Sequence, residues 1–328
     1  DGSSVCAETR WNRIRVACVQ PGMQTFPTDA NGIIFRQTAI DRGFTDNQLA
    51  RAVENKQIER IWPGAFLPKQ TLTREERHKR TAIAAGTPSG GSTALADESA
   101  AVLHGLSLLN ARWNKVHVAS GLKSGGRIDK RKHIHSGPLD AADVVTVEGV
   151  KVTSLEQTAV SIACSRGFYE ALAVFDSALR LGADRDVMAG KLESYRPGVL
   201  IGRRGLHYAN GKSENAGESW GRGQIIDDGL PIPDLQQEFH DREGEFIGRC
   251  DYAWSGKLVA EFDGMRKYQG DLRKGESPFD AMKREKIRED ALRRIGVMMI
   301  RWIWADLKDF KVAAMVREWL DQFGLLAA

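Results

Sequence analysis

Two short apolar runs, residues 245–254 and 257–262, constrain the fold most, because each has the length and composition of a buried strand yet carries an acid. Asp251 lies in the first run, Glu261 lies near the end of the second, and Asp263 follows on the same face as Glu261. Carboxylates this close repel each other in a dry interior unless a proton or cation lies between them. A divalent metal would relieve that repulsion, and this density of oxygen ligands suits Mg²⁺ (or Mn²⁺).

Length and charge narrow the class of protein. At 328 residues the chain exceeds one hydrophobic core, so several domains are expected. The net charge of +4, from 47 basic and 43 acidic residues, is compatible with a nucleic-acid partner without arguing for one. The 4 scattered cysteines form no CxxC pair, which argues against a zinc site of that spacing and favours a reduced, cytoplasmic compartment. No apolar run approaches about 18 residues, so no membrane partner is expected.

Residues 32–70 have the outline of a winged helix-turn-helix, after an N-terminal arm of residues 1–31. Helices are expected over residues 35–42 and 46–55, followed by a hairpin around Pro63. A small helical hairpin without DNA contact fits the same pattern. In a winged helix the second helix would enter the major groove of double-stranded DNA. The residues expected to contact DNA are Asn47, Gln48, Arg51, Lys56 and Arg60.

Residues 71–205 are expected to form a middle α+β domain, opened by a Thr-x-x-Glu capping box at Thr73. Its basic segment, residues 121–135, is expected to be a loop that ends in a strand around His133. Such a charge run is usually only solvated, but alternating glycine and basic residues also suit phosphate contacts. The candidate phosphate contacts are Lys123, Arg127, Lys130 and Arg131. His133 and His135 have no partner evident in the sequence and are interpreted as unremarkable.

Residues 213–328 are expected to form an α/β domain with the order helix, three strands, long helix, strand and closing helix. The first helix carries Glu218, which joins Asp251 and Glu261 as a candidate metal ligand. Phosphodiester cleavage needs a metal to neutralise charge and activate water, and a cation beside the reacting groups. Lys267 is the candidate cation, so the catalytic candidates are Asp251, Glu261, Asp263 and Lys267.

The runs GRCDYAW, KLVAEFDGMRKY and KREKIREDALRRIGVMMIRWIWADL together resemble the very-short-patch-repair-like endonuclease domain of the PD-(D/E)XK superfamily over residues 213–310. The matching positions are Asp251, Glu261, Asp263, Gly264, Arg288, Leu292, Gly296 and Arg301. The resemblance implies a restriction-endonuclease-like core. One departure is Asp263, where the superfamily usually has Lys. Either Lys267, Lys283 or Lys286 supplies the cation, or Asp263 is a further metal ligand, or the site is catalytically weak. Lys283 and Lys286 are also expected to contact DNA.

The N-terminal two-thirds resembles AbiEi-type antitoxin or transcriptional-regulator proteins of actinobacteria, through the motifs IERIWPGAFLP and ADESAAVLHGL. Together the resemblances imply a multi-domain α/β DNA-binding protein with a metal-dependent endonuclease domain, in phage defence or mobile-element biology, with a homodimer as one assembly. The alternative is an antitoxin or regulator whose degenerate nuclease-like domain only binds DNA or a cognate toxin. A structural interaction protein without chemistry is the third hypothesis.

Overall fold

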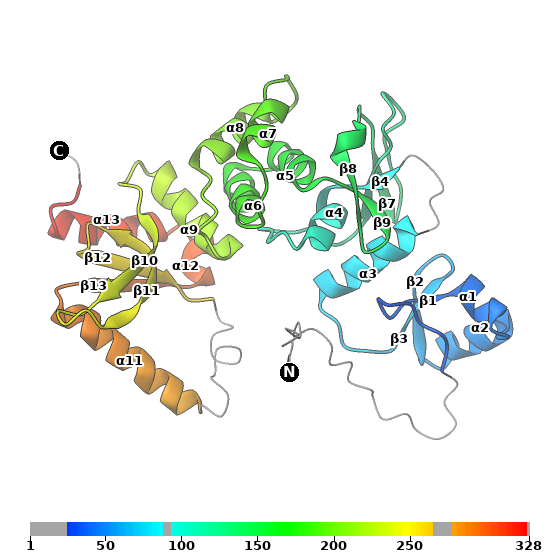
Figure 1. Cartoon of the computed structure of the whole chain (residues 1–328), viewed down its shortest axis with the longest axis horizontal. Helices are drawn as coiled ribbons and strands as arrows, with labels where there is room; N and C mark the ends of the chain where they lie inside the picture. Colours follow the sequence, from blue (N-terminus) through cyan, green and yellow to red (C-terminus); the bar gives the residue numbers. More distant parts are fainter. Residues whose placement is uncertain (1–24, 88–92, 265–276, 327–328) are drawn as a thin grey trace, which may run out of the picture. The chain divides into compact units, whose positions relative to one another are not determined.

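The structure is a computed structural model that describes residues 25–87, 93–264 and 277–326. The chain divides into two compact units, Asp1–Gln70 and Thr71–Ala328. Helices and three separate sheets alternate along it (Figure 1), so the expected multi-sheet α/β class is confirmed. Among the described residues no helix is long and apolar enough to cross a membrane.

The N-terminal unit packs two helices against a small antiparallel sheet of order β1-β3-β2. Its elements are β1 (Ile34–Phe35), α1 (Arg36–Asp41), α2 (Asp46–Glu54), β2 (Ile58–Trp62) and β3 (Ala65–Pro68). Thr45 caps α2 in a complete capping box with Gln48. The apolar face of α2, with Leu49 and Ala52, packs onto Ile34 and Phe66.

The second unit begins with a six-stranded sheet of order β6-β7-β5-β4-β9-β8. Its elements are α3 (Arg74–Gly86), β4 (Ala94–Leu95), α4 (Asp97–His104), β5 (Val116–Ala119), β6 (Arg127–Ile128), β7 (Lys132–His135), the 3-10 helix η1 (Ala141–Asp143), β8 (Val144–Val147) and β9 (Val150–Thr153). The expectation of a loop before His133 is wrong at β6, because Arg127 and Ile128 pair antiparallel with β7. β7 in turn pairs parallel with β5.

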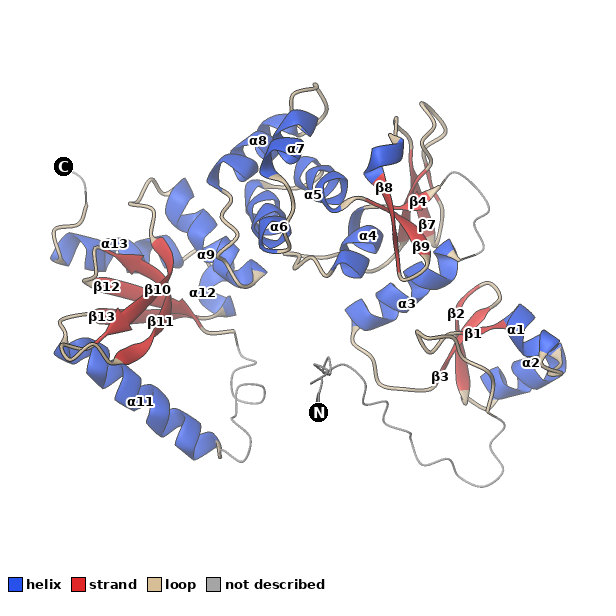
Figure 2. Ribbon diagram, in the orientation of Figure 1, coloured by secondary structure: helices blue, strands red, loops and turns tan. Residues whose placement is uncertain are grey.

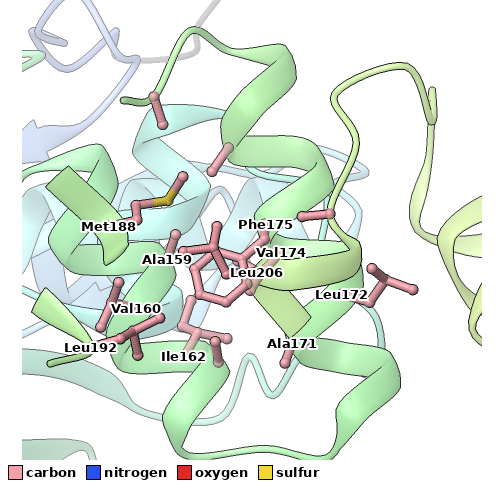
Figure 3. Close-up of a cluster of buried hydrophobic side chains, with 14 of the residues drawn as sticks. Ala159, Val160, Ile162, Ala171, Leu172, Val174, Phe175, Met188, Leu192 and Leu206 are labelled. Atoms are coloured by element: carbon pink, nitrogen blue, oxygen red, sulfur yellow. The ribbon is translucent and has the colours of Figure 1, made fainter. Parts of the chain in front are cut away.

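Four helices follow, α5 (Leu155–Cys164), α6 (Phe168–Arg180), α7 (Arg185–Lys191) and α8 (Val199–Tyr208). They enclose an apolar core around Phe175, Met188 and Leu206 (Figure 3). The arginine- and glycine-rich residues 195–206 indicate a helix-and-loop hinge, and the structure has a loop there that is followed by helix α8. Gly205 of this helix packs closely, since a Cβ there would lie 2.9 Å from the Cβ of Ala171.

The last part of the unit contains a four-stranded mixed sheet of order β10-β11-β12-β13 (Figure 2). Its elements are α9 (Ala216–Asp227), β10 (Asp234–His240), β11 (Phe246–Trp254), β12 (Leu258–Phe262), α11 (Pro278–Arg294), β13 (Met298–Trp302), α12 (Trp304–Lys308) and α13 (Val312–Gln322). The first three strands are antiparallel and β13 is parallel to β12. α9, α12 and α13 pack on one face, through Trp220, Leu307 and Val316. α11 packs on the other face through Leu292.

A buried ion pair joins the four-helix segment to this sheet layer. Arg222 of α9 donates from Nη2 to both carboxylate oxygens of Asp176 of α6, each at 2.7 Å. The same carboxylate accepts from Ser219 Oγ at 2.7 Å and from the backbone N of Asn210 at 2.6 Å. Both charges are almost fully enclosed, with side-chain exposures of 3% and 1%. The two segments therefore share an interior within the second unit.

Candidate functional site

The two strand acids lie opposite each other on β11 and β12. The antiparallel register pairs Tyr252 with Ala260, so its continuation places Asp251 at the level of Glu261, and both acids line the same cavity. The regular ladder ends there, and Asp251 accepts a hydrogen bond through Oδ2 from the backbone N–H of Phe262 at 2.9 Å. The side chain thereby substitutes for a backbone acceptor and is fixed against the end of β12.

Glu261 is buried, with 5% of its surface exposed, and is bound by two arginines. Arg288 of α11 donates from Nη2 to Oε1 at 2.6 Å, and Arg301 of β13 donates from Nε to Oε2 at 3.3 Å. Both arginines also pair with Glu285, and Arg301 with Glu289. Burial alone would lower the pKa of Arg288, but its bonds to Glu285 and Glu261 outweigh burial and raise that pKa. Both oxygens of Glu261 are therefore held by guanidinium groups.

Glu218 lies in the first turn of α9, 4% exposed and close to Asp251. Its oxygens accept from the backbone N of Glu214 at 2.7 Å and from Nδ2 of Asn215 at 2.5 Å. Burial first, and then the charge of Asp251, raises the pKa of Glu218 to about 8. Glu218 and Asp251 thus form the close carboxylate pair of the site.

Gln236 of β10 links those two acids. Its Nε2 lies 3.4 Å from Oε2 of Glu218 and 3.3 Å from Oδ1 of Asp251. Gln236 also has a φ of +56°, a left-handed conformation that is strained for a side-chain-bearing residue in a strand. Gln236 could not be predicted from the sequence, because only the fold brings β10 and α9 together around it.

Asp263 follows β12 and is held by its backbone, whose N–H donates to the carbonyl of Trp302 at 2.8 Å. Its Oδ1 is buried and has no hydrogen-bond partner among the residues that the structure describes. A buried carboxylate oxygen without a donor is costly unless a proton or a cation binds it. Lys267, the expected catalytic cation, lies outside the described residues.

A cavity of about 940 Å³ lies over these groups. Asp251, Glu261 and Asp263 line it from the sheet, and Lys286 and Arg288 line it from α11. Anionic and cationic side chains therefore face one space, which suits a metal together with a phosphate. Lys283 is exposed on the same helix but does not line the cavity.

The residues expected to contact DNA are mostly exposed. In the N-terminal unit Asn47, Arg51, Lys56 and Arg60 are all exposed. Gln48 is the exception, because its Oε1 accepts from the backbone N and Oγ1 of Thr45 at 2.8 and 3.0 Å. In the second unit the four basic residues of the expected phosphate segment are exposed as well, namely Lys123, Arg127, Lys130 and Arg131.

The middle segment also contains a group of ligand-type side chains that was not predicted from the sequence. His133 and His135, interpreted as unremarkable, lie beside His117, and the acids Asp97 and Glu98 approach His117 from α4. The signal in the sequence is the His-x-His spacing on a strand, since a period of two puts both rings on one face. The partners on β5 and α4 are distant in the sequence and become visible only in the fold.

No family model matches the chain. It is similar to two uncharacterized proteins of Mycobacterium tuberculosis, Rv2248 of strain H37Rv and MT2308 of strain CDC 1551. Each is 28% identical over 285 residues, which cover 85% of this chain and 98% of the relative. Among solved structures, the RV2827C protein of M. tuberculosis aligns with a TM-score of 0.36 and 12% identity, over 66% of this chain and 85% of that chain.

Proposed function

We propose that this protein is a DNA-binding, metal-dependent endonuclease whose chemistry takes place in the cavity above β11 and β12. The observation that carries the proposal is the shared lining of this cavity, in which Asp251 and Asp263 face Arg288. Hydrolysis of a phosphodiester needs carboxylates that bind a metal and cationic groups that bind the phosphate, because the phosphate and its metal must be bound together.

The donor set of this site suits a hard divalent cation. Asp251 and Asp263 supply carboxylate oxygens, and the buried Oδ1 of Asp263 lacks a donor among the described residues. Glu218 adds a third carboxylate beside Asp251, at a site where burial disfavours two free charges. These acids fit Mg²⁺ or Mn²⁺. Glu261 does not fit as a ligand while Arg288 and Arg301 hold its oxygens.

The bound ion would supply charge neutralisation at the phosphate and a more acidic water. Asp251 and Asp263, which line the cavity, would hold it, and Glu218 would add negative charge beside Asp251. Lys286 lines the same cavity and is exposed, so it is placed to bind a non-bridging phosphate oxygen. Gln236 would orient Glu218 and Asp251 through its amide. These assignments give a role at the metal site to three of the four predicted acids. Glu261 has a structural role instead, through its contacts with Arg288 and Arg301.

We further propose that the N-terminal unit is a winged helix-turn-helix that brings double-stranded DNA to the protein. Two helices followed by a β-hairpin support this, with α2 capped at Thr45 and Asn47 and Arg51 exposed. In such a domain the second helix reads base edges, and basic residues of the hairpin contact phosphates.

A second candidate function is a DNA-binding antitoxin or regulator with a degenerate nuclease domain. The observation that favours it is the double arginine contact to Glu261, together with Asp263 at the position of the usual Lys. In that protein the charge network of α11 and β13 would have only a structural role. An assay of DNA cleavage distinguishes the two candidate functions.

The test is relaxation of supercoiled plasmid by purified full-length protein in Mg²⁺ or Mn²⁺. We expect nicking or linearisation that EDTA stops, and Asp251→Asn should slow it by at least about 100-fold. Glu238→Gln is the matched control, because Glu238 is an exposed acid of the same sheet. If the wild type binds duplex DNA in a fluorescence anisotropy assay but never cuts it in either metal, the regulator function replaces the endonuclease.

A further inference from the structure

The histidine group of the middle segment lies outside the site described above and is built from three elements. β5 and β7 are parallel neighbours in a register that pairs His117 with His133 and Ala119 with His135. His133 and His135 are two apart on β7, so their rings share the face on which His117 lies. The ring centroids of His133 and His135 are 3.9 Å apart, and that of His117 is 5.1 Å from His133.

Two acids at the start of α4 face these rings. Asp97 Oδ2 lies 2.9 Å from His135 Nε2 and 3.6 Å from His117 Nδ1. Glu98 Oε2 lies 3.6 Å from Nε2 of His117. The side chains of Asp97 and Glu98 are only 8% and 4% exposed, so both carboxylates are removed from bulk water. A buried acid this close to imidazoles is a group that binds cations or protons.

Three of these atoms have the spacing of a coordination shell. His117 Nδ1 and His135 Nε2 are 3.0 Å apart, which closes a triangle with Oδ2 of Asp97. The point equidistant from the three atoms lies about 1.9 Å from each of them, slightly inside the bond length of about 2.0–2.1 Å that Zn²⁺ makes to His nitrogen and carboxylate oxygen. An ion slightly above the plane of the triangle would reach all three at normal length.

We propose that Asp97, His117 and His135 form a Zn²⁺ site, with His133 as the fourth ligand. A ligand nitrogen of each of the three histidines lies within 4.8 Å of those of the other two. Imidazole nitrogen with one carboxylate is a donor set for Zn²⁺ and not for Mg²⁺, which prefers oxygen. The ion would tie β5 and β7 to the start of α4.

The surroundings of the site hold its acids in place. Oδ1 of Asp97 accepts from Ser161 Oγ at 2.5 Å, which leaves Oδ2 turned toward the histidines. Glu98 is paired with Arg166 through its other oxygen. Asp97 has a φ of +44°, a left-handed conformation unusual for a residue that begins a helix. Such outer contacts orient metal ligands and raise their affinity.

The same distances also permit a metal-free network in which one proton of His135 is shared with Asp97 and His117. The test therefore measures metal content directly. Full-length protein is stripped with EDTA, dialysed against Zn²⁺ in the presence of excess Mg²⁺, and analysed by mass spectrometry of the metal and by calorimetric titration with Zn²⁺. We expect one Zn²⁺ per chain, with affinity reduced at least about 10-fold in His117→Ala and in His135→Ala.

Two controls separate metal binding from misfolding and from the other site. His240→Ala removes an exposed histidine of β10 and should leave Zn²⁺ binding unchanged, as should Asp251→Asn. Zn²⁺ at 100 times its Kd should raise the unfolding midpoint of the wild type by about 5 °C or more, and that of His135→Ala by much less. If the stripped wild type takes up no more Zn²⁺ than His117→Ala does, the cluster is a proton-sharing network and the proposal is wrong.

Discussion

Arg288 of α11 donates a hydrogen bond to Glu261 of β12 at 2.6 Å, across 27 positions of the sequence. The same guanidinium pairs with Glu285 one turn earlier in its helix. Arg301, the cross-strand neighbour of Glu261 on β13, completes the network. Two arginines thus converge on one buried glutamate, which makes their contact an element of fold stability as well as of the candidate site.

Arg288→Ala should lower the free energy of unfolding by about 2–3 kcal/mol, because it leaves the buried carboxylate of Glu261 with one cation in place of two. Urea unfolding followed by circular dichroism measures this. The matched control is Arg293→Ala, which removes an exposed arginine paired with Glu289 on the same helix. It should cost less than about 1 kcal/mol. Equal losses in the two variants would contradict a stabilising contact between Arg288 and Glu261.

Local signals in the sequence were enough to locate most helices and strands. Thr73 and Glu76, for example, form the predicted capping box at the start of α3. The contact between Arg288 and Glu261 could not be predicted, because helical spacing shows only the neighbour Glu285. The packing of Gly205 of α8 against Ala171 of α6 could not be predicted either, because the two residues lie far apart in the sequence. The acids of the candidate site could therefore be predicted from the sequence pattern of their strands. Their hydrogen-bonding partners could be identified only in the tertiary structure.

Asp176→Ala should destabilise the second unit by about 3–5 kcal/mol, since it leaves the guanidinium of Arg222 buried without its counter-charge. Chemical denaturation of the full chain would measure the loss. A double variant, Asp176→Ala with Arg222→Met, should recover part of it because no charge remains buried. The control Arg317→Ala breaks an exposed pair with Asp228 and should cost less than about 1 kcal/mol. A double variant less stable than Asp176→Ala would refute this account.

His78 should make the stability of the protein fall in mild acid. Its ring is buried and bonded to Ser99 Oγ at 2.9 Å. Burial first, and then the charge of His117, lowers the pKa of His78 to about 4. The unfolded chain therefore takes up the proton first, so the stability from neutral His78 is complete above about pH 6.5 and is lost as the pH falls toward 4.

The expected loss over that range is at most about 3 kcal/mol, measured as unfolding free energy against pH. His78→Gln should flatten this slope, whereas His240→Gln, at an exposed position, should leave it unchanged. The measurement is made in EDTA, so that metal binding at the neighbouring histidines does not contribute. A wild type and His78→Gln with the same slope between pH 6.5 and 4 would show that His78 does not cause the loss.

In the N-terminal unit, two neighbouring polar residues of α2 should behave differently when changed. Arg51 is exposed and, in the proposed recognition helix, Arg51→Ala should weaken DNA binding by about 5- to 30-fold. Gln48→Ala should instead lower the stability of the unit by about 0.5–1 kcal/mol, because Gln48 bonds the backbone of Thr45 at 2.8 Å. Anisotropy with labelled duplex DNA and thermal unfolding separate the two effects.

The control is Glu54→Gln, an exposed position at the end of the same helix. If Gln48→Ala lost as much DNA affinity as Arg51→Ala without losing stability, Gln48 would be a base-contacting residue and the cap would be secondary.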